Sequence, residues 1–366
     1  MSEYQYYEFQ AVDRPLTGEE QRAVSRLSSR VEPHPRRAIF VYNWGDFSAN
    51  PREVLVKYYD AMFYVANWGT TRLMFRFPKE LIDIRQLEPY CRNDYISCQT
   101  VGDYVVLDMT HSEEEGYFDW VEGEGTLDGL LPLRDDLMRR DYRTLYLAWL
   151  AGIDSWEVAE ETVEPPVPPG LKELTPPLRR LVEAFHLDEA LVKAAAEASP
   201  GRQQPAPLDL RERIAELPRE TCDEWLLRLA QGEEPHLSLS LRRLLEPERN
   251  GEPVTRKRRT VGQLLALAGA EQERLRQQAE AEAEARRIRE LEALASKAGD
   301  TWTFARQLLQ QGYSHYDEVV ELLGKLHDLA IHQGTEEEFE ARMQEIRTTY
   351  STRKTLLQRM DRAGLP

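Results

Sequence analysis

One segment, residues 263–298, restricts the folds open to this chain more than any other part of the sequence. It is rich in Ala, Glu, Arg and Leu, and at ~1.5 Å per residue an unbroken helix of that length would extend about 54 Å. Its middle offers little apolar surface beyond Leu275 and alanines, and Glu–Arg pairs three and four residues apart can form there. We therefore expect a solvent-exposed helix or a weak coiled coil, through which the chain could form a homo-oligomer.

The residues that follow form shorter segments, which end near Gly312, Gly334 and Gly364 and carry apolar residues at three- and four-residue spacing. Helices this short are not stable alone, so they must stack on one another. The pattern predicts a helical bundle or short array that holds a partner, and a compact bundle without a partner is the alternative. Our candidates for the interaction surface are the aromatic residues Trp302, Tyr316, Phe339 and Tyr350.

The N-terminal part of the chain alternates strand and helix patterns. The predicted strands are residues 4–12, 37–42, 71–77, 96–101 and 104–109. The last two flank Gly102-Asp103, which is a hairpin turn signal. Residues 51–66 begin with Pro51 and are apolar on nearly every side, which favours a buried helix, and a helix over 133–150 closes the domain. This order predicts an α+β domain with a mixed sheet and helices on at least one face.

At 366 residues the chain is too long for one ordinary core. Consecutive prolines at 165–169 favour an extended linker. The predicted division is an acidic α+β domain (1–160), a Pro-rich linker (161–177), a region of short helices with a basic end (178–259), and the long helix with its bundle (260–366). Residues 1–165 hold roughly −13 of the net charge.

Composition excludes several classes of function. A net charge of −17 argues against general nucleic-acid affinity, because phosphate binding needs a cationic face. No run approaches the ~18 apolar residues that cross a bilayer, and the first residues lack the pattern of a signal peptide. Three cysteines cannot form a disulfide framework, so we expect a cytoplasmic protein. Cys91 and Cys98, with no histidine near, are expected to be structural thiols.

Acidic residues gather around the second strand of the hairpin. Asp103, Asp108 and His111, followed by glutamates at 113–115, could hold a divalent metal or act as acid and base. A solvated acidic loop after the hairpin is the alternative. The sequence contains no phosphate-binding loop, dinucleotide fingerprint, nucleophile elbow or zinc-protease helix. We therefore predict no metal site and no cofactor, and treat these three residues as weak catalytic candidates.

Two further motifs are short. Asn43-Trp44-Gly45 recurs as Asn67-Trp68-Gly69, and we interpret the triplets as two turns with packed tryptophans at opposite edges of the sheet. Free N–H groups at a helix N-terminus favour anions, and a basic segment precedes the long helix. This segment could hold a phosphate or an acidic protein segment, but we favour a solvated linker or an intramolecular contact with the acidic N-terminal domain. Its residues are Arg256, Lys257, Arg258 and Arg259.

The tail contains Trp302, Tyr316-Asp317-Glu318-Val319-Val320-Glu321-Leu322-Leu323, Phe339, Arg342, Ile346-Arg347 and Arg362-Ala363-Gly364-Leu365. With these residues it resembles the helical tail of some bacterial SWIM zinc-finger proteins. The start, Glu3-Tyr4-Gln5-Tyr6-Tyr7-Glu8-Phe9, resembles that of uncharacterised bacterial hypothetical proteins. The zinc motif of the SWIM proteins is absent, so no metal residue is carried over. The resemblance implies a bacterial protein with a helical interaction tail.

Together these patterns predict a cytoplasmic bacterial adaptor or scaffold that acts by binding another protein. The acidic α+β domain would engage one partner and the C-terminal helices another. One alternative is a metal-dependent enzyme with a pocket in the N-terminal domain. A second is a nucleic-acid-associated protein that uses the basic segment before the long helix.

Overall fold

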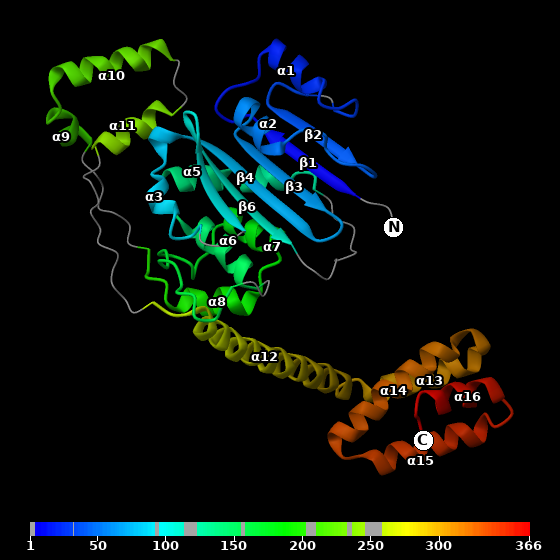
Figure 1. Cartoon of the computed structure of the whole chain (residues 1–366). Helices are drawn as coiled ribbons and strands as arrows, with labels where there is room; N and C mark the ends of the chain where they lie inside the picture. Colours follow the sequence, from blue (N-terminus) through cyan, green and yellow to red (C-terminus); the bar gives the residue numbers. More distant parts are fainter. Residues whose placement is uncertain are drawn as a thin grey trace. The chain divides into compact units, whose positions relative to one another are not determined.

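The computed structural model describes residues 4–31, 33–91, 95–112, 123–154, 158–202, 210–232, 236–245 and 258–366. The chain divides into two compact units, Met1–Gln272 and Glu273–Pro366. The first unit contains a six-stranded sheet with helices, and the second is helical (Figure 1). This confirms the predicted α+β domain followed by an all-α region with one long helix.

The sheet has the strand order β2-β1-β3-β4-β6-β5, and every pairing between its strands is antiparallel. It is therefore an antiparallel sheet and not the mixed sheet that we predicted. Its strands are β1 (Gln5–Gln10), β2 (Arg37–Tyr42), β3 (Ala61–Ala66), β4 (Thr70–Pro78), β5 (Ile96–Val101) and β6 (Tyr104–Ser112). Since β2 and β3 both pair antiparallel with β1, they run in the same direction with β1 between them. The strand-helix-strand order in the sequence therefore corresponds to a crossover that passes over β1.

The predicted helix over residues 51–66 is wrong in its second half. Helix α2 (Pro51–Tyr58) has Asn50 as its N-cap and ends at Tyr58, and β3 follows. All six residues of β3 are buried, because the strand lies inside the sheet and is covered on both faces. A short apolar run of this kind suits an interior strand as well as a buried helix, and periodicity cannot separate the two.

The assignment of residues 61–66 to a strand also changes where the two Asn-Trp-Gly triplets lie in the fold. Gln5 of β1 lies opposite Tyr42, the last residue of β2, and opposite Ala66, the last residue of β3. Both triplets therefore follow strands at the same end of the sheet, and the predicted opposite edges are wrong. The tryptophans are also not buried, since Trp44 is 70% exposed and Trp68 is 39% exposed.

Side chains alternate between the two faces of each strand, and each face has its own core. The α2 face carries an aromatic cluster beneath α1 (Gly18–Ser25) and α2. The α6 face packs against α4 (Thr126–Leu130), α5 (Pro132–Met138), α6 (Arg143–Asp154), α7 (Pro176–Ala184) and α8 (Glu189–Glu197). The predicted helix over 133–150 is thus two helices, α5 and α6, and Arg140 between them has a left-handed backbone.

Smaller elements complete this part of the first unit. A 3-10 turn, η1 (Lys79–Leu81), and a short helix, α3 (Ile84–Leu87), connect β4 to β5. The predicted Pro-rich linker, 161–177, is packed onto this unit, since Pro165, Pro168 and Leu171 are buried. The hydroxyl of Tyr90 also donates a hydrogen bond of 2.8 Å to the carbonyl of Pro166. This segment is therefore not a free spacer.

The long helix α12 (Val261–Ala295) is continuous over 35 residues. Val261, Leu264 and Ala268 in its first turns belong to the core of the first unit. Residues 272–287 are exposed or only half-buried, as expected from a stretch without an apolar stripe. The middle of the helix is thus held by its own backbone hydrogen bonds and not by packing.

The second unit is a bundle of α13 (Ala298–Gln311), η2 (Tyr313–His315), α14 (Tyr316–Gln333), α15 (Glu336–Thr349) and α16 (Lys354–Arg362). Trp302, Tyr316 and Phe339, which we predicted as an interaction surface, are 9%, 5% and 3% exposed and lie in the core of this bundle. Tyr350 is half-buried at its edge. The apolar pattern of these helices is satisfied within the bundle, so these aromatic residues mainly stabilise it.

A matched pair of aromatic residues in α13 tests this core. Trp302→Ala removes a buried ring and should lower the free energy of unfolding of the second unit by about 3–5 kcal/mol. Phe304→Ala, at a side chain that is 45% exposed, should change it by no more than about 0.5 kcal/mol. Urea unfolding of the full chain, followed by far-UV circular dichroism, gives both values. Equal losses in the two variants would contradict the assigned core.

Candidate functional site

Three short helices in the first unit expose large apolar residues to solvent. They are α9 (Leu210–Ala215), α10 (Arg219–Gln231) and α11 (Leu237–Leu245), and we call residues 210–232 and 236–245 the helical arm. The structure describes every residue of α9 and α10, and none of their side chains is buried. The large exposed apolar residues of the arm are Leu210 (44%), Ile214 (43%), Leu226 (59%), Leu227 (60%), Leu229 (65%) and Leu244 (47%).

Helix α11 attaches the arm to the rest of the first unit. It contacts α9, α10 and η1, and Figure 1 shows it between α10 and the sheet. Leu237 and Leu245, at the two ends of α11, are buried. Arg243 donates hydrogen bonds to the carbonyl of Glu80 at 3.2 Å and to that of Met138. One helix of the arm is therefore packed, and the other two project their apolar residues outward.

The polar anchor of the arm is His236, immediately before α11. Its Nε2 lies 2.7 Å from Oδ1 of Asp13, a residue in the loop after β1. The same carboxylate receives a bidentate pair of hydrogen bonds, each 2.8 Å long, from the guanidinium of Arg134 in α5. Arg134 is 1% exposed. A buried cation and a largely buried imidazole thus share one carboxylate.

A second buried carboxylate positions the first. Asp60 accepts hydrogen bonds from the backbone N–H of Val12 at 2.7 Å and of Asp13 at 2.9 Å. Nη2 of Arg76, in β4, donates to it at 2.6 Å, and Nε of Arg134 donates to the carbonyl of Arg76 at 2.9 Å. We call Asp13, Asp60, Arg76 and Arg134 the buried charge network. It joins the end of β1, the start of β3 and the end of β4.

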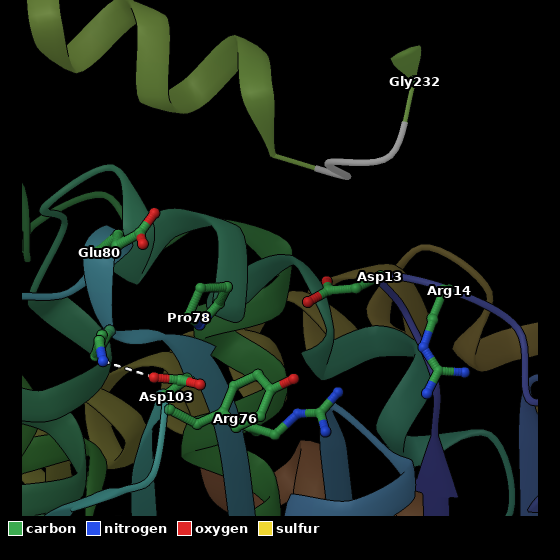
Figure 2. Close-up of a pocket in the computed structure, with 9 residues that line it drawn as sticks. Asp13, Arg14, Arg76, Pro78, Glu80, Asp103 and Gly232 are labelled. Atoms are coloured by element: carbon green, nitrogen blue, oxygen red, sulfur yellow. Dashed lines mark hydrogen bonds and ion pairs between the residues drawn. The ribbon is translucent and has the colours of Figure 1, made fainter. Parts of the chain in front are cut away.

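A cavity of about 710 Å³ opens beside this network, next to the turn that ends α10 (Figure 2). It is lined by Asp13, Arg14, Arg76, Pro78, Lys79, Glu80, Asp103, Tyr104 and Gly232. Each cation on its wall already has a carboxylate partner. Lys79 pairs with Asp103 at 2.6 Å, Arg14 with Glu20 at 2.6 Å, and Arg76 with Asp60. An anionic ligand would have to displace one of these partners.

The three predicted catalytic residues do not converge. Asp103 lies at the cavity wall with its side chain 85% exposed, and the Lys79 ammonium lowers its pKa. Asp108 and His111 are three residues apart in β6, so their side chains point to opposite faces of the sheet. Asp108 faces Arg52 and Arg72 on the α2 face. These three groups cannot act on one substrate atom.

The surroundings of Asp108 and His111 in β6 indicate a structural role for both residues. Burial acts to raise the pKa of Asp108, but the hydrogen bonds from Arg72 and Arg52, 2.6–2.7 Å long, outweigh it and the pKa is lowered. His111 is 4% exposed, and its ring centroid is 6.3 Å from that of Phe185 on the α6 face. The glutamates at 113–115 lie outside the described residues. Among those described, no three His, Cys, Asp or Glu side chains form a metal-binding group.

The basic segment is described only in part. Arg256 and Lys257 lie outside the described residues, and Arg258 is exposed, so its partner role stays a prediction. Arg259 pairs with Glu164 through bonds of 2.9 and 2.7 Å and donates to the carbonyls of Ala194 and Ala195 in α8. Glu164 is 1% exposed and also accepts from the hydroxyl of Tyr146. The guanidinium of Arg259 is therefore used inside the first unit.

The bundle offers a smaller depression. A cavity of about 180 Å³ is lined by Trp302, Phe339 and aliphatic residues of α14, and Arg342 lies over the Trp302 ring at 5.3 Å. It has room for about one side chain of a partner. The leucines of α10 expose more apolar surface, and our sequence analysis missed them. The sequence Trp225-Leu226-Leu227-Arg228-Leu229 could have indicated this surface, because it gives a short helix more leucines than one buried face needs.

Comparison of this chain with protein-family models, curated proteins and solved structures gave no match. The resemblance of the tail to SWIM zinc-finger proteins therefore stays a prediction. No helix among the described residues combines the length and apolar character that crossing a membrane requires.

The ion pairs of Asp13 predict an acid-dependent stability. Burial acts to raise its pKa, but His236 and Arg134 outweigh that effect and lower it to about 2 from an ordinary 3.8. Stability from a lowered carboxyl pKa is present above the unfolded value and is lost as pH falls through the folded one. The difference in unfolding free energy between the natural protein and Asp13→Asn should therefore shrink by about 2 kcal/mol between pH 5 and pH 2. Urea titrations at several pH values measure it, and a constant difference would contradict the assigned pairing.

Two neighbouring arginines test the burial of Glu164. Arg259→Ala leaves that carboxylate buried without its cation and should cost about 3–5 kcal/mol of unfolding free energy. Arg258→Ala, at the exposed neighbour, should cost no more than about 0.5 kcal/mol. The double variant Glu164→Gln/Arg259→Ala should recover part of the loss, since no buried charge then remains. Chemical denaturation of the full chain measures the unfolding free energy of each variant. Similar losses in Arg259→Ala and Arg258→Ala would refute the buried pairing of Arg259 with Glu164.

Proposed function

We propose that this protein is an adaptor that binds a partner protein through its helical arm. The observation that carries the proposal is that Leu226, Leu227 and Leu229 are 59–65% exposed on a helix without a buried residue. Helices of this length are marginal in water unless a face is packed. Fully burying one leucine contributes about 1.5–3 kcal/mol, so covering all three gives a partner several kcal/mol of affinity.

The chemistry of the arm suits an amphipathic helix of the partner. Leu226 and Leu229 are three residues apart and share one side of α10, with Leu227 beside them, which is the spacing that helix-on-helix recognition uses. Charges of both signs flank the leucines. Arg219 pairs with Asp223 at 3.0 Å, and the guanidinium of Arg228 lies 4.3 Å from the centre of the Trp225 ring. Such a rim favours a partner helix with its own leucine stripe and mixed charges.

The first unit holds the arm in place through α11. Helix α11 is held by two buried leucines, by the His236–Asp13 contact and by the hydrogen bonds of Arg243. Binding of a partner therefore does not have to order the whole arm. The second unit would supply a separate surface for another protein. The proposal keeps the bacterial cytoplasm as the compartment, which free Cys91, Cys98 and Cys222 suit.

Cys222 in α10 allows a direct test. A thiol-specific photo-cross-linker on this half-buried residue, in a Cys91→Ser/Cys98→Ser background, should capture the partner, which is then identified by mass spectrometry and purified. Leu226→Ser/Leu227→Ser/Leu229→Ser should weaken binding of the purified partner at least about 100-fold in calorimetry, because three apolar contacts are lost. The matched control is Leu265→Ser/Leu267→Ser in α12, where the leucines are 37% and 39% exposed.

The control variant should bind as the natural protein does, and circular dichroism should show the same helix content in all three proteins. Unchanged affinity of the arm variant would refute the proposal. So would a purified chain that forms a dimer by light scattering and cross-links to itself at Cys222, since the arm would then be a self-association surface.

A further inference from the structure

The two edge strands of the sheet have different surroundings. Strand β5, at one edge, also contacts α3 and α6, and its residues at 97, 99 and 100 are polar. Strand β2, at the other edge, is the outermost strand beside β1 (Figure 1), and it contains the apolar run Ala38-Ile39-Phe40-Val41-Tyr42. An apolar edge strand is a template on which another chain can pair, unless it is covered or blunted.

The direction of the backbone groups of β2 follows from its pairing with β1. The N–H of Ala11 donates to the carbonyl of Arg36 at 2.9 Å, one position beyond the paired residues Gln10 and Arg37. Directly hydrogen-bonded pairs and pairs without such bonds alternate along an antiparallel ladder. Residues 38, 40 and 42 therefore bond to β1, and residues 37, 39 and 41 direct their N–H and C=O groups away from the sheet.

Two of these outward-facing residues have open backbone groups. Arg37 exchanges hydrogen bonds of 2.8 and 3.3 Å with His34, in a turn that limits the accessible edge. The described residues make no hydrogen bond to the N–H or C=O groups of Ile39 and Val41. The side chains of both residues are half-buried on the α6 face. The edge thus offers two donors, two acceptors and a partly exposed apolar surface to an added strand.

Exposed arginines lie at both ends of this edge. Residues 22–37 contain five arginines and one glutamate, in a chain whose net charge is −17. Arg36, directly before β2, donates to two carbonyls in the segment after β1. At the other end, the guanidinium of Arg30 lies 5.6 Å from the centre of the Tyr42 ring and 5.3 Å from that of the Trp44 ring. Neither arginine has a carboxylate partner among the described residues, so both ends are cationic.

We propose that β2 is a docking edge for an extended acidic segment of a partner protein, which adds to the sheet as a further strand. The backbone of the segment pairs with Ile39 and Val41, its apolar side chains cover those of the same two residues, and its carboxylates pair with Arg30 and Arg36. In strand addition, backbone hydrogen bonds give affinity and side chains give specificity. Arginine suits this role because its planar fork binds a carboxylate through two hydrogen bonds. The site is separate from the helical arm and does not depend on the function proposed for it.

The same charges argue against a second copy of this chain as the occupant. Two β2 strands paired antiparallel about a two-fold axis would place the Arg36 end of one beside the Arg30 end of the other. Like charges that face each other across paired strands are destabilising. A nucleic acid would contact the arginines through its phosphates, but it lacks the alternating N–H and C=O groups of a strand. The open backbone groups therefore favour a polypeptide, and the arginines favour an acidic one.

A synthetic peptide tests the edge directly. The probe is a fluorescein-labelled peptide of alternating valine and glutamate, about eight residues long, which is enough for one strand. It should bind the full chain in fluorescence anisotropy and slow amide hydrogen exchange in the segment that contains Ile39 and Val41. A probe with N-methylated valines lacks the pairing donors, and one with lysine in place of glutamate reverses the charge. Each should bind at least about tenfold more weakly.

Variants of the chain then locate the site. Val41→Pro removes one outward N–H and should weaken binding of the probe at least about tenfold, while Val41→Thr keeps this donor and should change binding less than about threefold. Arg30→Glu/Arg36→Glu should weaken binding at least about tenfold at low salt. The matched control is Arg286→Glu/Arg287→Glu in α12, which changes the net charge equally and should bind the probe as the natural chain does.

Circular dichroism should show the same secondary structure in all variants. If Val41→Pro does not fold, the N-methylated probe and the arginine variants still decide. Equal binding of the N-methylated probe, or unchanged binding by Arg30→Glu/Arg36→Glu, would overturn the proposal. So would tighter binding of a labelled single-stranded oligodeoxythymidine than of the acidic probe, or a dimer in light scattering whose β2 amides already exchange slowly.

The two docking proposals can be told apart with one variant. Leu226→Ser/Leu227→Ser/Leu229→Ser, which removes the exposed leucines of α10, should bind the acidic probe as the natural chain does. Loss of probe binding in this variant would overturn the assignment of the probe to β2. A failure of the arm to bind a partner leaves the result at β2 unchanged.

Discussion

The carboxylate of Asp60, which is 1% exposed, is the group on which the geometry of the first unit most depends. A buried anion is costly unless hydrogen bonds and a cation satisfy it. Here the N–H groups of Val12 and Asp13 and the guanidinium of Arg76 do so, and they come from the end of β1 and from β4. The loop after β1 is therefore fixed, and the Asp13 side chain is directed to its partners. The attachment of the helical arm follows from a charge buried at the rim of the sheet.

Local patterns in the sequence predict most of the elements, because turns, caps and apolar spacing are local properties. The Gly102-Asp103 hairpin, Pro51 at the start of α2 and the long helix are examples. The β3 strand was missed because Ala61–Ala66 is apolar on all sides, and only the sheet decides that both of its faces are covered. The same limit applies to Trp302. Its spacing shows that one helix face is apolar, but the neighbours that cover that face come from distant parts of the chain.

The candidate site was less predictable, because function depends on which side chains meet. Asp108 and His111 are close in sequence, yet strand alternation separates them, while Arg259 pairs with Glu164, 95 positions earlier. The leucines of α10 have the pattern of any amphipathic helix, and a sequence does not say whether such a face is covered.

The strand order also has a consequence for how the protein folds as it is synthesised. Two hairpins, β3–β4 and β5–β6, join neighbouring strands by short turns, and such local contacts form quickly. The pairing of β1 with β3 brings together Gln10 and Ala61, so the loop between them must close first. Strand β1 leaves the ribosome before β3 exists and can pair only with β2. Until β3 arrives, one edge of β1 has open hydrogen-bonding groups beside an aromatic face, which is the stage at which the growing chain is most exposed to aggregation.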